Sequence, residues 1–152
     1  AKIIIDNQTF SSIERGYLVF VCIEVNDSFE QVKEMTDKII NFRMLDGPKG
    51  LTSRSLKDSN EEALIVSQFT LAAITNKGTK PSFHKAAKPD EAKLLYDKFL
   101  IEFKSLFPKV KEGKFGAFME INLVNFEILG KPNTLKQMLP QIQMIYRRHK
   151  VE

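Results

Sequence analysis

The chain is poor in cysteine: Cys22 is the single cysteine among 152 residues, so no disulfide can form within the chain. Cys22 lies inside the apolar run Leu18-Val19-Phe20-Val21-Cys22-Ile23, where a cysteine usually behaves as a small buried hydrophobe with an unreactive thiol. We therefore expect a buried thiol and a reducing, cytoplasmic location.

Long hydrophobic segments are also absent. No apolar run approaches the roughly 18 residues that span a bilayer, and the first residues lack the charged-then-apolar pattern of a signal peptide. With 43% hydrophobic and 28% charged residues, the composition is that of an ordinary globular protein. We expect one domain over residues 1–152 and no membrane partner.

Histidine is scarce, since His84 and His149 are the two in the chain. Neither lies in a motif that would make it the base of a Ser/His/Asp triad. No Cys/His cluster offers a zinc site, and the acidic residues are scattered at helix-surface spacing. This pattern argues against a zinc hydrolase and against a standard serine hydrolase, and it predicts no metal and no cofactor.

Hydrophobic periodicity predicts an α/β protein with the element order β-β-α-β-β-α-β. The fold class that we expect is a single-domain mixed or antiparallel β-sheet, or an open barrel, packed by two main helices. The polar stretch 52–60 is expected to be a loop. The expected strands cover residues 2–7, 16–25, 43–45, 62–69 and 116–124, and the expected helices cover residues 29–40 and 89–107.

The end of the chain has a pattern of its own. Residues 134–151 carry apolar side chains at helical spacing, interrupted by Pro140. Three interpretations stay open for this tail: it covers the sheet, it extends a contact between two copies, or it replaces the last strand of the sheet.

The most informative segment is Leu64-Ile65-Val66-Ser67-Gln68-Phe69-Thr70-Leu71. An apolar, strand-like run ends there in hydrogen-bonding side chains, which must find partners if they are buried. Such a strand end usually reaches the wall of a site. A basic, glycine-containing stretch follows, Thr75-Asn76-Lys77-Gly78-Thr79-Lys80-Pro81-Ser82-Phe83-His84.

Together these segments resemble the signature of the D-aminoacyl-tRNA deacylases, whose members read SQFTL, then a short Lys/Gly loop, then Pro-x-Phe. Three more segments are similar to that family, namely residues 13–21, 38–45 and 111–119. The resemblance extends over residues 13–125, about three quarters of the chain. At the N-terminal end, the family's opening strand and hairpin are expected to be reduced or absent here.

The resemblance implies a pocket that holds the terminal adenosine and the aminoacyl group of a tRNA. It makes Thr70 the candidate nucleophile or water-positioning residue, with Ser67 beside it in the catalytic group. Ser67 and Gln68 would also orient the adenosine. The implied substrate-binding residues are Gln68, Phe69, Phe83, Gly116 and Asn125. Alternatives remain open for three of them, because Phe69 could be a core aromatic, Phe83 a loop anchor, and Gly116 a strand bend.

The net charge of +4 and a pI near 9.1 suit a polyanionic partner without demanding one. Basic residues concentrate in segments 77–93, 104–114 and 147–150. The resemblance assigns tRNA phosphate contacts to Lys77, Lys80 and Lys85; the competing interpretation is a solvated face. The partners implied are a tRNA that carries a D-amino acid and a second copy of the chain in a homodimer.

The sequence departs from the family after Asn125. Family members continue with Gly-Pro-Val-Thr, whose cis Gly-Pro peptide enters the partner's pocket and rejects L-aminoacyl groups. Here Glu127-Ile128 occupies that register, while a gapped register offers a displaced motif of Gly130, Pro132 and Thr134. Lys131 separates the glycine from the proline, so we expect weaker discrimination between D and L substrates.

Two functions follow from these observations. The first is hydrolysis of the ester bond of D-aminoacyl-tRNA, a chirality-proofreading reaction that releases the free D-amino acid and the tRNA. The alternative is a non-catalytic or weakly active relative that acts as a nucleic-acid-binding protein. The intact segment Ser67–Leu71 favours the hydrolase, whereas the divergent residues 126–152 favour the alternative.

Overall fold

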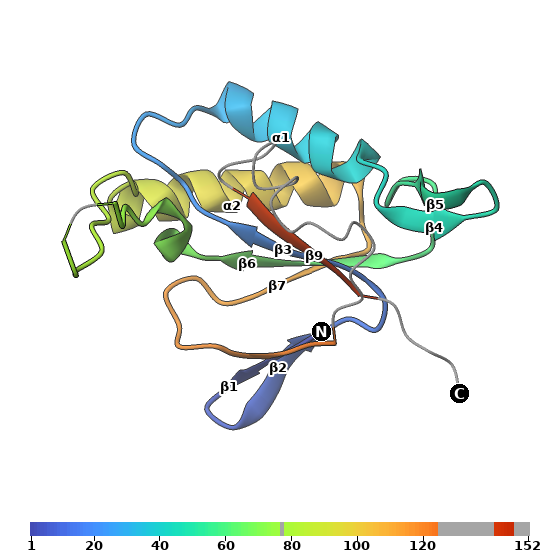
Figure 1. Cartoon of the computed structure of the whole chain (residues 1–152), viewed down its shortest axis with the longest axis horizontal. Helices are drawn as coiled ribbons and strands as arrows, with labels where there is room; N and C mark the ends of the chain where they lie inside the picture. The colour runs from blue at the N-terminus through green and yellow to red at the C-terminus, as the bar shows by residue number, and fades with distance from the viewer. Residues whose placement is uncertain (77, 125–141, 148–152) are drawn as a thin grey trace.

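The computed structural model describes residues 1–76, 78–124 and 142–147. Two long helices and several short strands make up this part of the chain (Figure 1). The strands are β1 (Lys2–Ile5), β2 (Gln8–Ser12), β3 (Gly16–Val21), β4 (Leu45–Gly47), β5 (Gly50–Arg54), β6 (Glu62–Ser67), β7 (Val110–Glu112), β8 (Glu120–Asn122) and β9 (Ile142–Arg147). The helices are α1 (Phe29–Asn41), the 3-10 turn η1 (Phe69–Ala72) and α2 (Pro89–Leu106).

The elements form layers. A four-stranded sheet in the order β7-β6-β3-β9 has both helices on one face and a smaller sheet, β2-β1-β8, on the other (Figure 1). Strand β6 runs parallel to β3 and to β7, whereas β9 is antiparallel to β3. The β4–β5 hairpin lies at one end. The predicted α/β class with a mixed sheet and two main helices is therefore confirmed.

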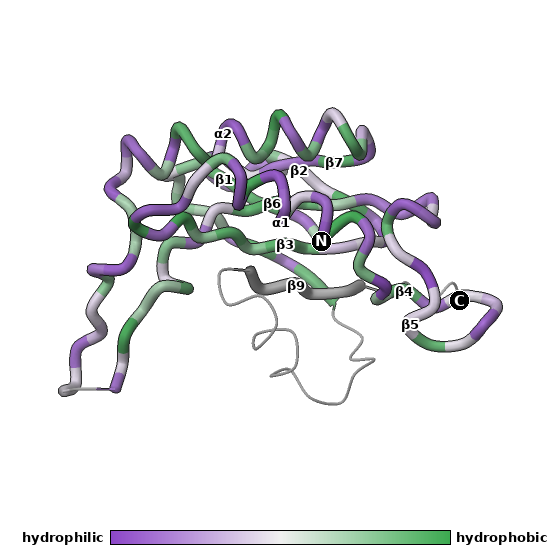
Figure 2. Tube along the Cα trace, turned by 90° about the horizontal axis from the view of Figure 1, so that it is seen from above, coloured by the Kyte–Doolittle hydropathy of each residue, from purple (hydrophilic) through white to green (hydrophobic). Residues whose placement is uncertain are grey.

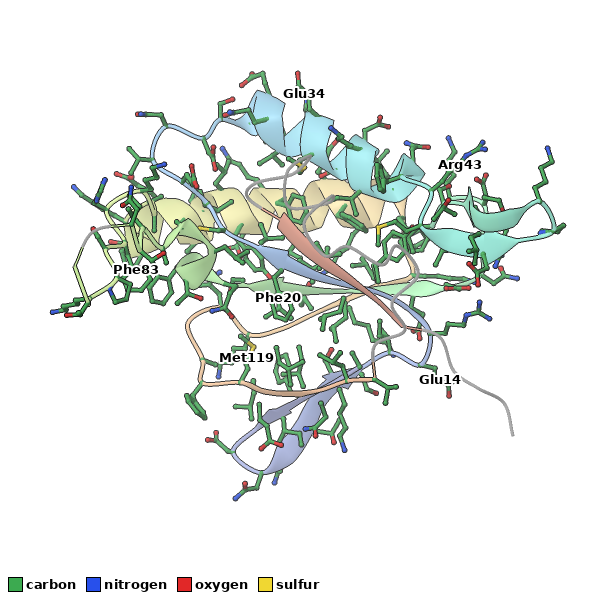
Figure 3. All side chains as sticks on the ribbon, in the orientation of Figure 1. Glu14, Phe20, Glu34, Arg43, Phe83 and Met119 are labelled. Atoms are coloured by element: carbon green, nitrogen blue, oxygen red, sulfur yellow. The ribbon has the colours of Figure 1, made fainter. Side chains whose placement is uncertain are left out.

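The central strands β3 and β6 are buried on both faces. On β3, Tyr17 and Val19 join the core beneath the helices, while Leu18 joins a second core toward the small sheet. Figure 3 shows Phe20 and Met119 in the space between the two sheets, where both pack against that second core. A strand covered on both sides reads as a continuous apolar run, which explains the sequence pattern of β6.

Both predicted helices are confirmed, and their ends follow local rules. Ser28 caps α1: its hydroxyl accepts from the Gln31 backbone N–H, and the Gln31 side chain accepts from the Ser28 N–H. Pro89 is the first residue of α2, where a missing N–H costs nothing. Hydrophobic and hydrophilic segments alternate along the helices (Figure 2), as expected for elements with one buried face.

The expectation of a reduced or absent N-terminal hairpin is wrong. Strands β1 and β2 pair antiparallel, and Asp6 and Asn7 form the two-residue connection with φ of 50° and 61°. Asp and Asn tolerate this left-handed conformation, which matches the twist of a tight hairpin.

Several boundaries also differ from the sequence prediction. Strand β6 ends at Ser67 because the chain turns into η1, and residues 52–54 of the predicted loop belong to β5. Strand β4 starts at Leu45 rather than at residue 43. The predicted strand 116–124 is shortened to β8, since Gly116 has a positive φ of 74° in the loop that precedes it.

Residues 142–147 form the strand β9, although this part of the sequence has apolar residues at helical spacing. This strand hydrogen-bonds to β3 from Gly16↔Arg147 to Val21↔Ile142. Pairing with the backbone of β3 outweighs the local helical spacing. Of the three interpretations, the replacement of a sheet strand fits this segment. Residues 134–141 and 148–151 lie outside the described part, and one domain over residues 1–152 stays a prediction.

The buried thiol is confirmed. Cys22 is 3% exposed, and its Sγ lies 3.6 Å from the carbonyl oxygens of Ile23 and Phe69. Burial raises the pKa of the Cys22 thiol to about 11, so little thiolate forms at neutral pH. Neither described helix is long and apolar enough to cross a membrane.

Candidate functional site

The candidate site begins where β6 ends. The Gln68 backbone N–H donates to the Val21 carbonyl at 2.7 Å, and the chain then turns into η1 instead of continuing as a strand. The carboxyl ends of the parallel strands β3 and β6 therefore meet beside Ser67 and Gln68. Open α/β sheets commonly bind ligands in the crevice outside such strand ends.

A pocket of about 730 Å³ opens at this point, and we call it the β6 pocket. It gathers five predicted site residues, which are Ser67, Gln68, Phe69, Phe83 and Gly116. They come from β6, η1, the loop before α2 and the loop before β8. The remaining lining residues are Val66, Ala86, Ala87, Lys88, Pro89, Ala92, Phe115, Ala117, Phe118, Met119 and Ile121. The apolar lining with a few polar groups is typical of a small-molecule or nucleoside site.

Two aromatic rings form one wall of the pocket. Phe69 and Phe83 pack edge to face, with ring centroids 5.2 Å apart and an interplanar angle of 66°. Phe69 is 60% exposed, so it is not a core aromatic. Phe83 lies in the loop between η1 and α2, at the end of the molecule where α2 begins (Figure 3). An exposed aromatic wall offers a face on which a base can stack.

Thr70 lies beside the pocket and is not among its lining residues. Its hydroxyl accepts a hydrogen bond from the Gln68 side-chain amide, and both residues are accessible to solvent. Thr70 thus fixes the orientation of Gln68, which does line the pocket. The catalytic role assigned to Thr70 and Ser67 stays a prediction.

The other predicted residues divide into two groups. Lys80 and Lys85 are exposed on the loop that precedes α2, next to Phe83. Gly116 lines the pocket with a φ of 74°, and a Cβ there would meet no atom within 4 Å, so its backbone faces open space. Lys77, Asn125, Gly130, Pro132 and Thr134 lie outside the described residues.

Sequence reasoning missed Phe118, which is 94% exposed and lines the pocket. The sequence does contain a signal for this residue. In the alternating segment 116–124, Phe118 falls on the same side as the polar residues Glu120 and Asn122. The exposed Phe118 ring is available to contact a ligand that enters the pocket. Lys88 was also missed, and it adds a cation to the lining.

In the residues that the structure covers, no group of three His, Cys, Asp or Glu side chains could hold a metal ion. The polar side chains that line the pocket are those of Ser67, Gln68 and Lys88. The arrangement can therefore orient a ligand by hydrogen bonds and stacking.

The fold and the pocket define a layered α/β protein with a mostly apolar pocket at the carboxyl ends of parallel strands. A family model described as D-Tyr-tRNA(Tyr) deacylase matches residues 1–126. The chain belongs to this family. The resemblance found in the sequence is thereby confirmed.

Individual relatives agree with this assignment. The D-aminoacyl-tRNA deacylase of Thermosipho africanus is 43% identical over 125 residues, which are 82% of this chain and 84% of the relative. The D-aminoacyl-tRNA deacylase of Saccharomyces cerevisiae is 41% identical over 128 residues, covering 82% of this chain and 85% of the relative.

Two solved structures are similar as well. The c-Myc DNA Unwinding Element Binding Protein is 30% identical, with a TM-score of 0.79 over 97% of this chain and 93% of the other. A chain described as a probable eukaryotic D-amino acid tRNA deacylase shares the fold, with a TM-score of 0.64, 17% identity and coverage of 78% and 85%.

Proposed function

We propose that the chain hydrolyses the ester bond of D-aminoacyl-tRNA and releases the free D-amino acid and the tRNA. The observation that carries the proposal is the β6 pocket, where the polar end of β6 meets the Phe69–Phe83 wall. Family membership and relatives named as D-aminoacyl-tRNA deacylases support it over a non-catalytic, nucleic-acid-binding role.

The geometry supports a division of labour in the pocket. The terminal adenine stacks on the Phe83 side of the aromatic wall, which is worth roughly 1–3 kcal/mol per base. Gln68, held by Thr70, and Ser67 donate to or accept from the ribose and the ester. Holding the ester in one orientation lowers the barrier, since positioned reactants no longer lose that freedom in the transition state.

The reaction itself is the attack of water on the ester carbonyl. The bond between the carbonyl carbon and the ribose oxygen breaks, and the ribose oxygen takes up a proton. The neighbouring ribose hydroxyl of the substrate lies within reach of that ester and assists the proton transfer. The backbone N–H groups of η1 are the proposed donors to the developing oxyanion.

The first prediction tests the activity and its selectivity. The purified chain should deacylate D-Tyr-tRNA, and the ratio of D to L rates should stay below about 200-fold, because a loosely shaped contact is worth only about 1–3 kcal/mol. Substituting Phe83→Ala should lower kcat/KM by about 5- to 150-fold through lost stacking. Release of labelled tyrosine measures both effects.

One control variant and one contrary outcome accompany this measurement. Leu51→Ala removes a large apolar side chain that is 65% exposed on β5 and lies outside the β6 pocket, and it should leave the rates unchanged. Tight tRNA binding without release of either enantiomer would instead support the nucleic-acid-binding alternative.

A second prediction concerns Lys80 and Lys85, which we propose contact tRNA phosphates together with Lys77. Replacing Lys80 and Lys85 by glutamine should lower the log–log salt slope of tRNA binding by about 0.7 to 0.9 for each lost contact. Fluorescence anisotropy at several salt concentrations gives the slope. An unchanged slope would identify these lysines as a solvated face.

We further propose that the chain works as a homodimer, which the exposed Phe118, Leu123 and Val124 support. Sedimentation of the purified chain tests the dimer. A tRNA substrate and a buried, reduced thiol support a cytoplasmic location, which cell fractionation tests.

A further inference from the structure

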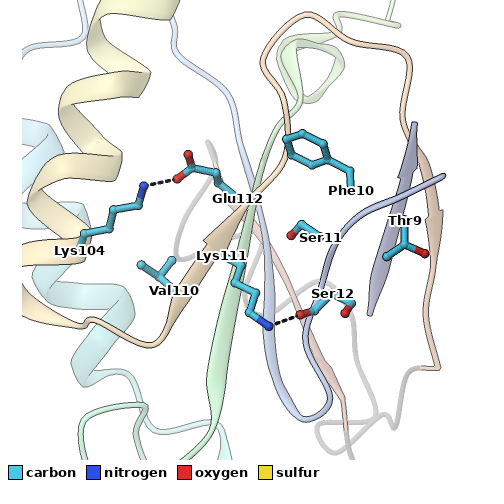
Figure 4. A pocket seen from close by; sticks show the side chains of 8 residues that line it. All are labelled: Thr9, Phe10, Ser11, Ser12, Lys104, Val110, Lys111 and Glu112. Atoms are coloured by element: carbon cyan, nitrogen blue, oxygen red, sulfur yellow. Dashed lines mark hydrogen bonds and ion pairs between the residues drawn. The ribbon is translucent and has the colours of Figure 1, made fainter. Parts of the chain in front are cut away.

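No residue of the basic segment 104–114 lines the β6 pocket. Two other hollows lie along this segment. One, of about 490 Å³, lies between β2, β7 and the end of α2 (Figure 4). The other, of about 660 Å³, surrounds the start of β6. Val110 and Lys111 line both, so the hollows adjoin. We call them together the β7 groove, and its lining is Thr9, Phe10, Ser11, Ser12, Glu14, Arg15, Arg54, Asn60, Glu61, Glu62, Lys104, Pro108, Lys109, Val110, Lys111 and Glu112.

The alternation around Val110 leaves Lys109, just before β7, and Lys111, within β7, on the exposed side. Val110 packs against the core beneath the helices. Lys111, on the other face of the strand, reaches the β2 strand and donates from Nζ to the Ser12 carbonyl at 2.6 Å (Figure 4). Lys109 donates to the Asn60 carbonyl and side-chain oxygens at 3.3 and 3.2 Å. Within the described residues, Lys109 has no carboxylate partner.

The groove also contains carboxylates, and three of the four are less exposed than the side chains of Lys104 and Lys111. Glu61 is 8% exposed and is held by Arg15 and Arg54, whereas the side chains of Lys104 and Lys111 are about half exposed. Burial raises the pKa of the Glu61 carboxyl, against the opposing effect of the two arginines.

The same layering holds for two further carboxylates. Lys104 pairs with Glu112 at 2.5 Å, and Lys111 pairs with Glu62 at 3.4 Å. Glu14 is the exposed carboxylate of the groove. The five cations thus exceed the four carboxylates by one, and a ligand that enters from solvent meets ammonium groups first.

Hydroxyl groups complete the wall that faces the lysines. Thr9, Ser11 and Ser12 line the hollow in Figure 4. The Ser11 hydroxyl oxygen is buried and has no hydrogen-bond partner among the described residues. Lysines together with serine and threonine hydroxyls are the side chains that contact nucleic-acid phosphates.

The β7 groove leads to the β6 pocket along the chain. After Glu112 the backbone continues through Gly113 and Lys114 to Phe115, which lines the pocket. Lys93 of α2 lies over the Phe115 ring, 6.0 Å from its centroid, at this junction. Strand β6 also connects the two sites, because Glu62 at its start lines the groove and Ser67 at its end lines the pocket. The two residues are about 17 Å apart at the usual rise per residue.

We propose that the β7 groove binds backbone phosphates of the RNA whose 3′ end occupies the β6 pocket. This inference rests on the proposed function and names a second anchoring surface for the same substrate. The groove fixes the approach of the RNA through charge and hydroxyl contacts and reads no bases.

The test measures binding of deacylated tRNA to the full chain over a series of salt concentrations. The double variant Lys109→Gln with Lys111→Gln should lower the log–log salt slope by about 1.4 to 1.8, since each phosphate contact contributes about 0.7 to 0.9. Arginine at both positions should restore the slope. The matched control is Lys38→Gln with Lys49→Gln, which removes the same charge from α1 and from the turn between β4 and β5 and should leave the slope unchanged.

A short substrate separates this inference from the proposed function. A D-aminoacylated terminal trinucleotide fills the β6 pocket but is too short to lie along the groove, so the glutamine variant should hydrolyse it at the parent rate. If neither substrate is hydrolysed, the proposed function fails while the salt slope still reports on the groove. An unchanged slope in the glutamine variant, or an equal loss in the control, would overturn the inference. So would a loss of self-association in that variant, which would make the groove a contact between copies. Thermal melting confirms that each variant is folded.

Discussion

A chain with alanine in place of Gly16 is expected to lose about 4 kcal/mol of unfolding free energy. Gly16 begins β3 with a φ of 148°, and a Cβ built there would lie 1.8 Å from the Glu62 carbonyl oxygen. The atom in the way is backbone of the neighbouring strand, so the clash cannot be relieved by moving a side chain. Overpacking and a strained φ each cost about 1–3 kcal/mol.

Urea unfolding followed by circular dichroism measures this loss, and the chain offers a close control. Gly50 also has a positive φ, of 105°, but a Cβ there would meet no atom within 4 Å. Gly50→Ala therefore reports the backbone strain alone, and we expect a loss of about 1 kcal/mol. Equal losses of unfolding free energy at the two positions would show that the close contact of Gly16 with the β6 backbone is not the reason why glycine is needed there.

The second large effect is expected from the substrate. A D-Tyr-tRNA whose terminal ribose lacks the neighbouring hydroxyl should be deacylated about 100- to 10,000-fold more slowly, the usual range for a lost general acid or base. Thr70→Val in the chain should have the smaller effect, because Thr70 hydrogen-bonds Gln68 and lies outside the pocket lining. Single-turnover release of tyrosine, corrected for spontaneous hydrolysis, compares the two.

This comparison also separates two mechanisms. If Thr70→Val abolishes turnover while the deoxy substrate reacts normally, Thr70 is the nucleophile. Thr70→Ser serves as the control, since it keeps a hydroxyl for the Gln68 side chain. A binding measurement with a non-hydrolysable amide analogue shows whether either change acts on affinity instead.

Elements with a strong local signal were predictable from sequence. The apolar run of β6 indicated a doubly covered strand, and Ser28 and Pro89 marked the starts of both helices. The polar residues after Val66 indicated a site, and the structure places Ser67, Gln68 and Phe69 in one pocket with Phe83. In each case the residues concerned are close in sequence, or their hydrophobic spacing is typical of only one type of secondary structure.

The errors, and the tail whose interpretation the sequence left open, lie where distant segments decide the outcome. Residues 142–147 have helical spacing but pair with β3, because an unpaired strand backbone is a stronger determinant than local propensity. The end of β6 was placed too late, since the turn at Gln68 depends on a hydrogen bond to Val21 in another strand. The position of Thr70 outside the pocket lining and the exposure of Phe118 depend in the same way on how loops pack against one another. Hydrophobic periodicity in the sequence carries no information about that packing.

The pairing of β3 with β9 has a consequence for how the protein matures. Gly16 pairs with Arg147, which lies far along the chain, so β3 is synthesised long before this partner strand. Until then, β3 presents an apolar strand with one unpaired edge, which is a template for association with other chains. Closure of the four-stranded sheet therefore waits for residues 142–147, and this long-range pairing makes it slower than the formation of α1 and α2.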